Sequence, residues 1–195
     1  MSIATKTGDK GTTGTLFGER VGKSDIVIQA VGDIDELNAC LGLIKPELQQ
    51  LYSIYENRIT QEARGIMIKD NALIEEIQRT LTYYMGEISA GADHREDYAQ
   101  KYTSVTLEDI EKLNTLVAEI EKSLPKQKDW VLYGNSSIGS KFDFSSKVCR
   151  RAERSVVSLL IQQEPIRAEL LQYINRLSDL LYLQARKYDY KSKKF

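Results

Sequence analysis

Apolar residues recur at alternating spacings of three and four along most of this sequence, and no other feature restricts its fold as strongly. That spacing places the apolar side chains on one face of an α-helix. Five stretches show it, with the stripes Ile34, Leu37, Leu41, Ile44, Leu48, Leu51 and Tyr55; Ile74, Ile77, Leu81, Tyr84 and Ile88; Ile110, Leu113, Val117, Ile120 and Leu124; Val148, Cys149, Ala152, Val156 and Leu159; and Leu170, Ile174, Leu177 and Leu181. Five amphipathic helices with little strand signal predict an all-α protein, a five-helix bundle with up-and-down-like topology.

The sequence also predicts where these helices begin and end. Asp33 followed by Glu36 resembles a capping box and would start the first helix. Pro46 would kink or interrupt that helix. Three stretches lack apolar periodicity and are expected to be a linker or frayed extension (57–70), a loop (130–141) and a frayed tail (187–195).

Length and charge exclude several classes of protein. At 195 residues, with no internal repeat, the chain is expected to fold as a single domain over residues 1–195. A net charge of -1 favours neither nucleic acid nor an anionic membrane as a partner, and no apolar run is long enough to span a bilayer. A glycine-threonine motif begins at residue 5 and leaves no room for a signal peptide, so we expect a cytoplasmic protein.

Cysteine and histidine usage argues against a metal site built by the protein. Cys40 and Cys149 lie far apart inside helical patterns and are expected to be buried thiols in a reducing compartment. His94 is the only histidine, which argues against a His-rich metal site and a Ser-His triad. A diiron bundle would need a Glu three residues before a histidine, where this chain has Gly91.

Glycine, threonine and lysine are concentrated near the N-terminus, in a leading loop expected to cover residues 1–30. The glycines would let backbone N–H groups approach an anion without a Cβ in the way, while hydroxyl and ammonium groups surround it. The residues are Gly8, Gly11, Gly14, Thr5, Thr7, Thr12, Thr13, Lys6 and Lys10. The pattern favours a cradle for phosphate groups, and the alternative interpretation is a flexible terminus.

This loop is not the common P-loop. The nearest match, Gly18–Ser24, is one residue shorter than a Walker A motif, and no β-branched apolar run precedes it. Lys23 within that stretch is still placed to contact a phosphate.

A cluster of arginines stands in the fourth predicted helix. Arg150 and Arg154 are four residues apart and share a face, whereas Arg151 points about 100° away. Glu153 can orient a neighbouring arginine. These side chains either line a cleft that binds an anion or form a solvated, salt-bridged face.

Two further polar groups have both a functional and a structural interpretation. Asp35 lies in the first turn of the first predicted helix, where it compensates the helix dipole or pairs with an arginine of a neighbouring subunit. In the fifth helix, Asn175 and Ser178 could reach an adenosine sugar, and Asp179 could hold Arg176. The alternative for this second group is a polar seam in the bundle.

Taken in order, these motifs resemble the trimeric ATP:cob(I)alamin adenosyltransferases of the propanediol-utilisation type. The resemblance covers nearly the whole chain and includes the family's fold, a five-helix bundle. It rests on five motifs: Thr5–Gly11, Gly18–Arg20 with Lys23, Gly32–Asn38, Val148–Arg154 and Tyr173–Asp179.

The resemblance implies a site shared between subunits of a homotrimer. The ATP phosphates, with Mg²⁺, would be held by Thr5, Lys6, Thr7, Gly8, Thr13, Gly14 and Lys23. Arg150 and Arg154 would clamp the triphosphate from the next subunit, alongside Arg151 and Glu153. Asn175 would touch the nucleoside, and Asp35 would form a salt bridge with Arg150 across the interface.

The resemblance also implies the reaction. Cob(I)alamin is itself a strong nucleophile, so its Co(I) attacks the 5′ carbon of ATP and triphosphate leaves. The protein then has to align the reactants and stabilise charge on the leaving group. Trp130, Phe142 and Phe144 are candidates for the wall of the corrin pocket. A reductase or a cobalamin-dependent acceptor enzyme would be a partner.

The departures from the family pattern lie on the cobalamin side. Tyr133 and Asn135 stand where a Pro and a Gly are usual, Ser146 stands in place of an arginine, and a histidine is replaced around Asp143. They make a non-catalytic carrier or sensor of ATP or cobalamin the alternative function. A purely structural helical oligomer is a third interpretation.

Overall fold

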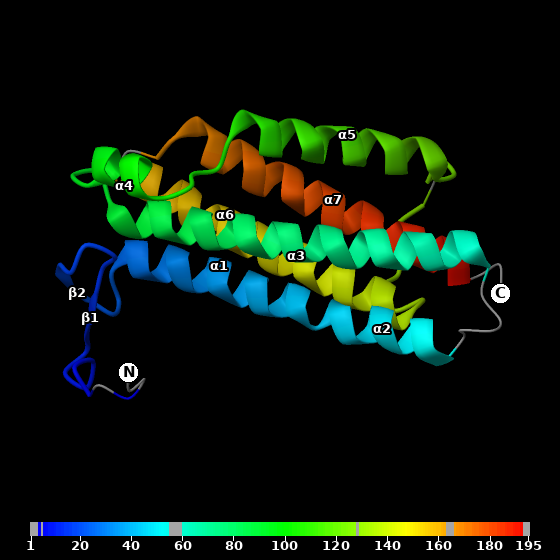
Figure 1. The fold of residues 1–195 in the computed structure, drawn as a ribbon, viewed down its shortest axis with the longest axis horizontal. Helices are drawn as coiled ribbons and strands as arrows, with labels where there is room; N and C mark the ends of the chain where they lie inside the picture. The colour runs from blue at the N-terminus through cyan, green and yellow to red at the C-terminus, as the bar shows by residue number, and fades with distance from the viewer. Residues whose placement is uncertain (1–3, 5, 55–59, 128, 163–165, 193–195) are drawn as a thin grey trace.

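The computed structural model describes residues 4, 6–54, 60–127, 129–162 and 166–192, and it is mostly helical. Figure 1 shows long helices lying side by side along one direction, with a small sheet at one end of the bundle. The described elements are β1 (Thr12–Gly14), β2 (Arg20–Gly22), α1 (Ile26–Gly42), α2 (Ile44–Ile54), α3 (Gln61–Ala90), α4 (Arg95–Lys101), α5 (Leu107–Ser123), α6 (Ser137–Ile161) and α7 (Ala168–Ser192). The all-α class predicted from the sequence is confirmed, and the two-stranded sheet is an addition to it.

The predicted apolar stripes form the core of the bundle. α1 packs against α3 and α6, and α7 packs against α5 and α6. Ile34, Leu37 and Leu41 of the first stripe are fully buried. Each such side chain contributes about 1.5–3 kcal/mol on burial, so the stripes supply most of the driving force for assembling the helices. Tyr55 of the first stripe lies outside the described residues.

The helix count differs from the five that the sequence predicted, because seven helices are described. The first predicted helix is interrupted at Leu43, and Figure 1 shows α2 continuing the line of α1. Pro46 falls in the first turn of α2, where its missing N–H has no helical partner to lose. The other additional helix is α4, too short to show a periodic stripe.

The predicted start of the first helix is wrong. Asp25, not Asp33, is the N-cap of α1, and its carboxylate accepts a hydrogen bond from the Val27 N–H at 2.8 Å. Asp33 lies about two helical turns further on. It is buried and accepts a hydrogen bond from the Ser155 hydroxyl of α6. A tertiary contact with α6 therefore explains the acidic residue that was read as a cap.

Two stretches expected to be irregular are helical for a common reason. α3 begins at Gln61 after the N-cap Thr60, and α7 continues to Ser192, so most of the expected linker and much of the expected frayed tail are ordered helix. Asp70 is buried, and its two oxygens each lie 2.8 Å from the Lys187 ammonium. These polar residues pair with each other, which periodicity cannot reveal. Residues 57–59 and 193–195 lie outside the described part of the chain.

The expected loop over 130–141 is shorter than predicted, because α6 begins at Ser137. The Ser136 hydroxyl caps α6 by accepting from the Gly139 N–H at 3.0 Å, and it donates to Asp189 of α7 at 2.8 Å. A Cβ on Gly139 would lie 2.3 Å from the Asp189 carboxylate, so only glycine allows this close approach. Among the described residues, no helix has the length and apolar character needed to cross a membrane.

Candidate functional site

The N-terminal loop is folded by its own backbone into tight turns. Lys6 adopts a φ of 58° and Gly11 a φ of 79°, in the left-handed region that the turns require. The Gly11 N–H donates to the Gly8 carbonyl at 3.2 Å, and the Lys23 N–H donates to the Gly11 carbonyl at 2.9 Å. β1 and β2 pair in antiparallel register, with Thr12 opposite Gly22 and Gly14 opposite Arg20. The glycine-threonine segment is therefore a closed loop held by a hairpin.

Two cations lie directly on this loop. Arg20 donates to the Thr7 carbonyl at 2.7 Å and also to the Thr12 hydroxyl. The Lys23 ammonium lies against Gly8, since a Cβ built on Gly8 would be 3.1 Å from it. The structure thus brings together Thr7, Gly8 and Lys23, three of the predicted phosphate-binding residues. Arg20 also contacts this loop, although the sequence analysis assigned it no binding role. Its place in the Gly18–Arg20 motif could have indicated such a role.

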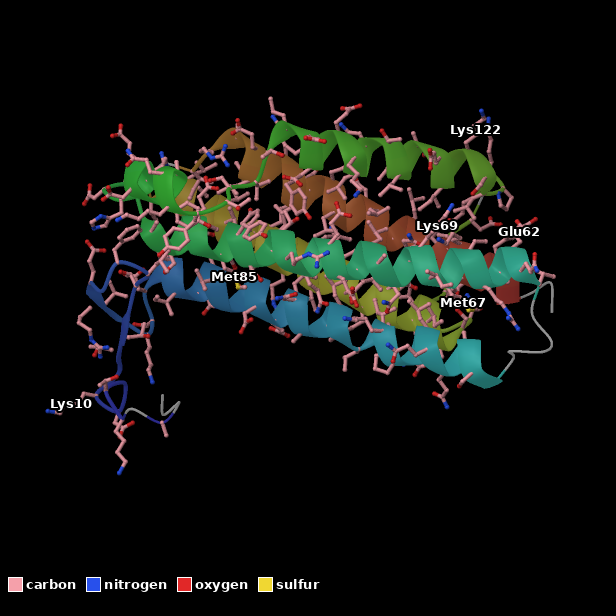
Figure 2. The ribbon with its side chains drawn as sticks, viewed as in Figure 1. Lys10, Glu62, Met67, Lys69, Met85 and Lys122 are labelled. Atoms are coloured by element: carbon pink, nitrogen blue, oxygen red, sulfur yellow. The ribbon has the colours of Figure 1, made fainter. Side chains whose placement is uncertain are left out.

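The rest of the predicted loop set is partly described. Lys6, Thr13 and Gly14 lie in the same loop and hairpin, whereas Thr5 falls outside the described residues. Lys10 points away from the bundle in Figure 2. Positively charged side chains and glycine-rich backbone therefore project from the end of the bundle, which is a suitable surface for a polyphosphate.

The three arginines of α6 are used differently. Arg151 forms ion pairs with Asp33 and Glu36 of α1, and the hydrogen bond with Glu36 raises the pKa of its guanidinium. Arg150 and Arg154 are exposed. Among the described residues, no carboxylate lies within ion-pairing distance of either, and Arg154 donates to the Arg150 carbonyl of its own helix at 2.9 Å. These two side chains share a face and are available to an anionic ligand, whereas Arg151 is structural.

The residues predicted to lie near the nucleoside also differ in their exposure and contacts. Asn175 of α7 is exposed and donates to Glu153 of α6 at 2.8 Å, so these two predicted residues are adjacent. Asp179 holds Arg176 at 3.1 Å, as the spacing suggested. Ser178 is buried and donates to the Asn175 carbonyl at 2.9 Å. The suggestion that Ser178 reaches a sugar is therefore wrong, because its hydroxyl is turned into its own helix.

Asp35 does not pair with Arg150 within one chain. Asp35 is exposed on α1, and the α1 carboxylates that contact α6 are those of Asp33 and Glu36. The resemblance implied that the Asp35 pair forms between subunits, and a single chain does not test that.

The three aromatic residues suggested for the wall of a corrin pocket also differ in their exposure. Phe142 is buried and stacks on Tyr188 with ring centroids 5.7 Å apart, so it belongs to the core and not to a ligand pocket. Trp130 is almost fully exposed and Phe144 is half exposed. Phe144 lines a hollow of about 380 Å³ between the α1–α2 junction and α6, together with Cys40, Leu43, Ser137, Ser140 and Lys141.

Neither cysteine is a nucleophile in this arrangement. Burial raises the pKa of the Cys149 thiol well above its ordinary value, and its Sγ donates to the Ile174 carbonyl at 3.4 Å. Burial likewise raises the pKa of the Cys40 thiol. Both are buried free thiols, as predicted, and neither has the lowered pKa of an activated nucleophile.

The chain and its fold match a known family. A model of the cobalamin adenosyltransferase family matches residues 3–188. The chain belongs to this family. A cobalamin adenosyltransferase of Cupriavidus metallidurans is 34% identical over 94% of this chain and 86% of its own length. A corrinoid adenosyltransferase of Bacillus subtilis is 33% identical over 95% of this chain and 86% of its own length.

Solved structures of this family share the fold over almost the whole chain. A variant of the PduO-type ATP:corrinoid adenosyltransferase of Lactobacillus reuteri, complexed with cobalamin and ATP, has a TM-score of 0.80 and 27% identity, covering 98% of this chain and 93% of that one. A second variant of that enzyme, complexed with ATP, has a TM-score of 0.79. The corrinoid adenosyltransferase PduO of Citrobacter freundii is 32% identical, and the match spans 50% of its length.

Proposed function

We propose that this chain transfers the 5′-deoxyadenosyl group of ATP to cob(I)alamin, giving adenosylcobalamin and triphosphate. The observation that carries the proposal is the likeness over 98% of the chain to an adenosyltransferase complexed with both cobalamin and ATP. In this reaction the Co(I) of cob(I)alamin supplies the electron pair that forms the Co–C bond, and the bond from the 5′ carbon to the triphosphate oxygen breaks. The protein needs no nucleophile of its own, which agrees with the two inert cysteines.

The chain's cations would stabilise the departing triphosphate. The loop around Gly8, with Lys23 at its side, would receive phosphate oxygens through backbone N–H groups and an ammonium. Arg150 and Arg154 would add two guanidinium groups that form no ion pair with a described carboxylate of their own chain. Their hydrogen bonds strengthen as negative charge accumulates on the leaving oxygen, so they lower the barrier and do more than bind ATP.

Magnesium would enter with the nucleotide. Among the described residues, no cluster of three or more His, Cys, Asp or Glu side chains could hold a metal ion. Mg²⁺ is commonly held by substrate phosphates, water and one or two protein oxygens. The hydroxyls of Thr7 and Thr13 are oxygen donors of that kind within the loop, so the residues present suit an ion carried by ATP.

The active site would be completed by a second subunit of a homotrimer. The loop projects from the end of the bundle, whereas Arg150 and Arg154 are exposed on α6, and we infer that each contributes to a site completed by another copy. The family resemblance implies that Asp35 binds Arg150 of the neighbouring subunit, and both side chains are exposed in the single chain, as such a pair requires. The five-helix bundle implied by the family resemblance would correspond to α1 with α2, α3, α5, α6 and α7. The two free thiols suit a reducing compartment such as the cytoplasm, where a reductase would supply Co(I).

One observation favours a second candidate, a carrier or sensor that binds ATP or cobalamin without turnover. The segment before α6 carries Tyr133 and Asn135 in place of the family's Pro and Gly, and Trp130 stands almost fully exposed there. A protein whose corrin-binding segment has changed, while its ATP-binding residues are intact, would bind its ligands without catalysing the reaction.

An anaerobic assay separates the two candidates. Chemically reduced cobalamin is mixed with Mg·ATP and the protein, and the loss of Co(I) absorbance is followed together with triphosphate release. We expect conversion to a light-sensitive product with one triphosphate per adenosyl group. Saturable binding of ATP or cobalamin without conversion would instead establish the carrier, and failure to bind either ligand would reject both candidates.

A further inference from the structure

The hairpin that carries the phosphate loop is docked on the bundle through its turn. Within this turn (residues 15–19), the Leu16 N–H donates to the Ser89 hydroxyl of α3 at 3.1 Å. The Phe17 ring stacks on the His94 ring with centroids 4.5 Å apart and planes 13° from parallel. Both partners lie at the corner between α3 and α4, which Figure 1 shows at the same end of the bundle as the sheet. The turn is therefore seated on the corner by a backbone contact and a ring stack.

Charged groups surround the stacked rings of Phe17 and His94. The His94 Nε2 lies 3.5 Å from Glu19 of the turn, and its Nδ1 lies 3.5 Å from Asp97 of α4. The Lys101 ammonium lies 5.7 Å from the centre of the Phe17 ring. The His94 side chain is 30% exposed, so the stack is partly sheltered from water. His94 thus touches the hairpin through its face, which meets Phe17, and through its edge, which meets Glu19.

The turn is rigidly connected to the phosphate loop. The Thr15 N–H donates to the Glu19 carbonyl at 2.8 Å, which closes the turn directly onto β1 and β2. Arg20, the next residue, donates to Thr7 and Thr12 of the loop. A tilt of the turn would therefore move the carbonyl of Thr7 and the backbone around it.

We propose that His94 is a positioning residue for ATP: its stack on Phe17 and its contact with Glu19 fix the angle at which the hairpin presents the phosphate loop. In this role His94 acts on ATP through the turn, by way of Phe17 and Glu19. The proposal rests on the proposed function, since it assumes that this loop holds the ATP phosphates.

The first test separates positioning from general destabilisation. In His94→Ala the KM for ATP should rise about fivefold, the worth of one aromatic pair with its edge contact, while the KM for cob(I)alamin stays within about twofold. His94→Phe keeps the stack and should restore most of the ATP affinity. Glu96→Gln, an exposed neighbour on α4, is the matched control. A loss of kcat with both KM values unchanged would overturn the proposal, because that pattern reports only less folded enzyme.

The second test does not use activity. Limited trypsin digestion at Arg20 and Lys23 reports opening of the hairpin, and we expect cleavage there to be about fivefold faster in His94→Ala than in the wild type or Glu96→Gln. Unchanged cleavage would overturn the docking role. If wild-type protein failed to bind ATP, the proposed function would fall, while the digestion would still decide whether His94 holds the hairpin.

Discussion

Arg151 and Arg154 are three residues apart on α6 and differ in what they contact. Arg151 forms ion pairs with Asp33 and Glu36, and these pairs hold α6 against α1. Arg154 donates to the carbonyl of Arg150, and its charge is left for a ligand. Helical spacing already placed Arg151 on another face than Arg154, but only the position of α1 shows which of the two pairs with carboxylates.

Replacing Arg154 tests this distinction. We expect Arg154→Ala to lower kcat/KM by about 100-fold or more, the usual cost of removing a charged donor from a leaving group, with the melting temperature little changed. Steady-state kinetics and thermal unfolding measure the two effects. Arg79→Ala, an exposed arginine on α3, is the control. Near-wild-type turnover in Arg154→Ala would remove this residue from the catalytic set.

A substitution at Asp70 tests how much a buried ion pair contributes to stability. Its carboxylate accepts from Lys187 and from the Tyr188 hydroxyl, and it is only 5% exposed. Asp70→Asn would leave the Lys187 charge without its partner in a partly buried site, so we expect a loss of about 3–5 kcal/mol in the free energy of unfolding. Urea denaturation measures it, with Asp93→Asn at an exposed position as the control. A change in unfolding free energy below about 1 kcal/mol would mean that water solvates the Lys187 ammonium once the carboxylate is lost.

At the level of elements, the start of α6 depends on contacts with two other helices. Ser136 caps it and bonds Asp189 of α7, while Glu47 of α2 binds Lys141 and accepts from Ser137 at 3.1 Å. These contacts fix where the preceding segment joins the bundle.

A pair of glycine substitutions measures how closely α6 and α7 approach. A Cβ on Gly139 would clash with Asp189, so Gly139→Ala should lose about 1–3 kcal/mol of unfolding free energy. Gly65 lies inside α3 with no atom within 4 Å of an added Cβ, so Gly65→Ala should gain about 0.5–1 kcal/mol. Urea unfolding of both variants gives the comparison, and equal effects would contradict the close packing at Gly139.

The link between α2 and α6 should depend on pH in a defined direction. The hydrogen bond from Lys141 lowers the pKa of Glu47 in the folded state, followed by that from Ser137. The stabilisation is therefore present above the ordinary glutamate pKa and disappears as the pH falls through the lowered folded value. We expect Glu47→Gln to be less stable than wild type at pH 7 and equally stable at strongly acidic pH. A stability difference that does not change with pH would contradict this linkage.

Much of the element pattern could be predicted from the sequence, because apolar spacing directly records the buried face of a helix. Ile34, Leu37 and Leu41 are an example, since they are both regularly spaced and fully buried. The start of α1 and the extents of α3 and α7 were missed where polar residues are satisfied by distant partners, as Asp33 is by Ser155. The sequence also singled out Gly8 and Lys23, which the structure places side by side, because glycine and cations are local features of the chain. Their binding of phosphate stays a prediction.

At the scale of the whole molecule, the candidate site is divided between two surfaces. The loop stands at the end of the bundle and the free arginines stand on α6, and the sequence alone could not say which copies meet. Spacing along one chain carries no information on contacts between chains, so the Asp35–Arg150 pair stays a prediction.

Mixing two inactive variants tests the shared site. Lys23→Ala damages the loop half and Arg154→Ala the arginine half, so each variant should be nearly inactive if the protein forms the proposed homotrimer. After subunits are exchanged in equal amounts, about a quarter of the sites should combine an intact loop with intact arginines, if assembly is random. Recovery of about that share of wild-type turnover is expected. No recovery, with subunit exchange verified by mass spectrometry, would place each site within one chain.

The buried pair of Asp70 with Lys187 has a consequence for biosynthesis. The two residues are 117 positions apart, and Asp70 also depends on Tyr188, so the beginning of α3 keeps an uncompensated carboxylate until the last helix has been translated. Burying that charge alone is unfavourable. We therefore expect the part of the bundle around Asp70 to close only after residue 188 has left the ribosome. A ribosome stalled before that point would display a half-packed bundle to chaperones and proteases.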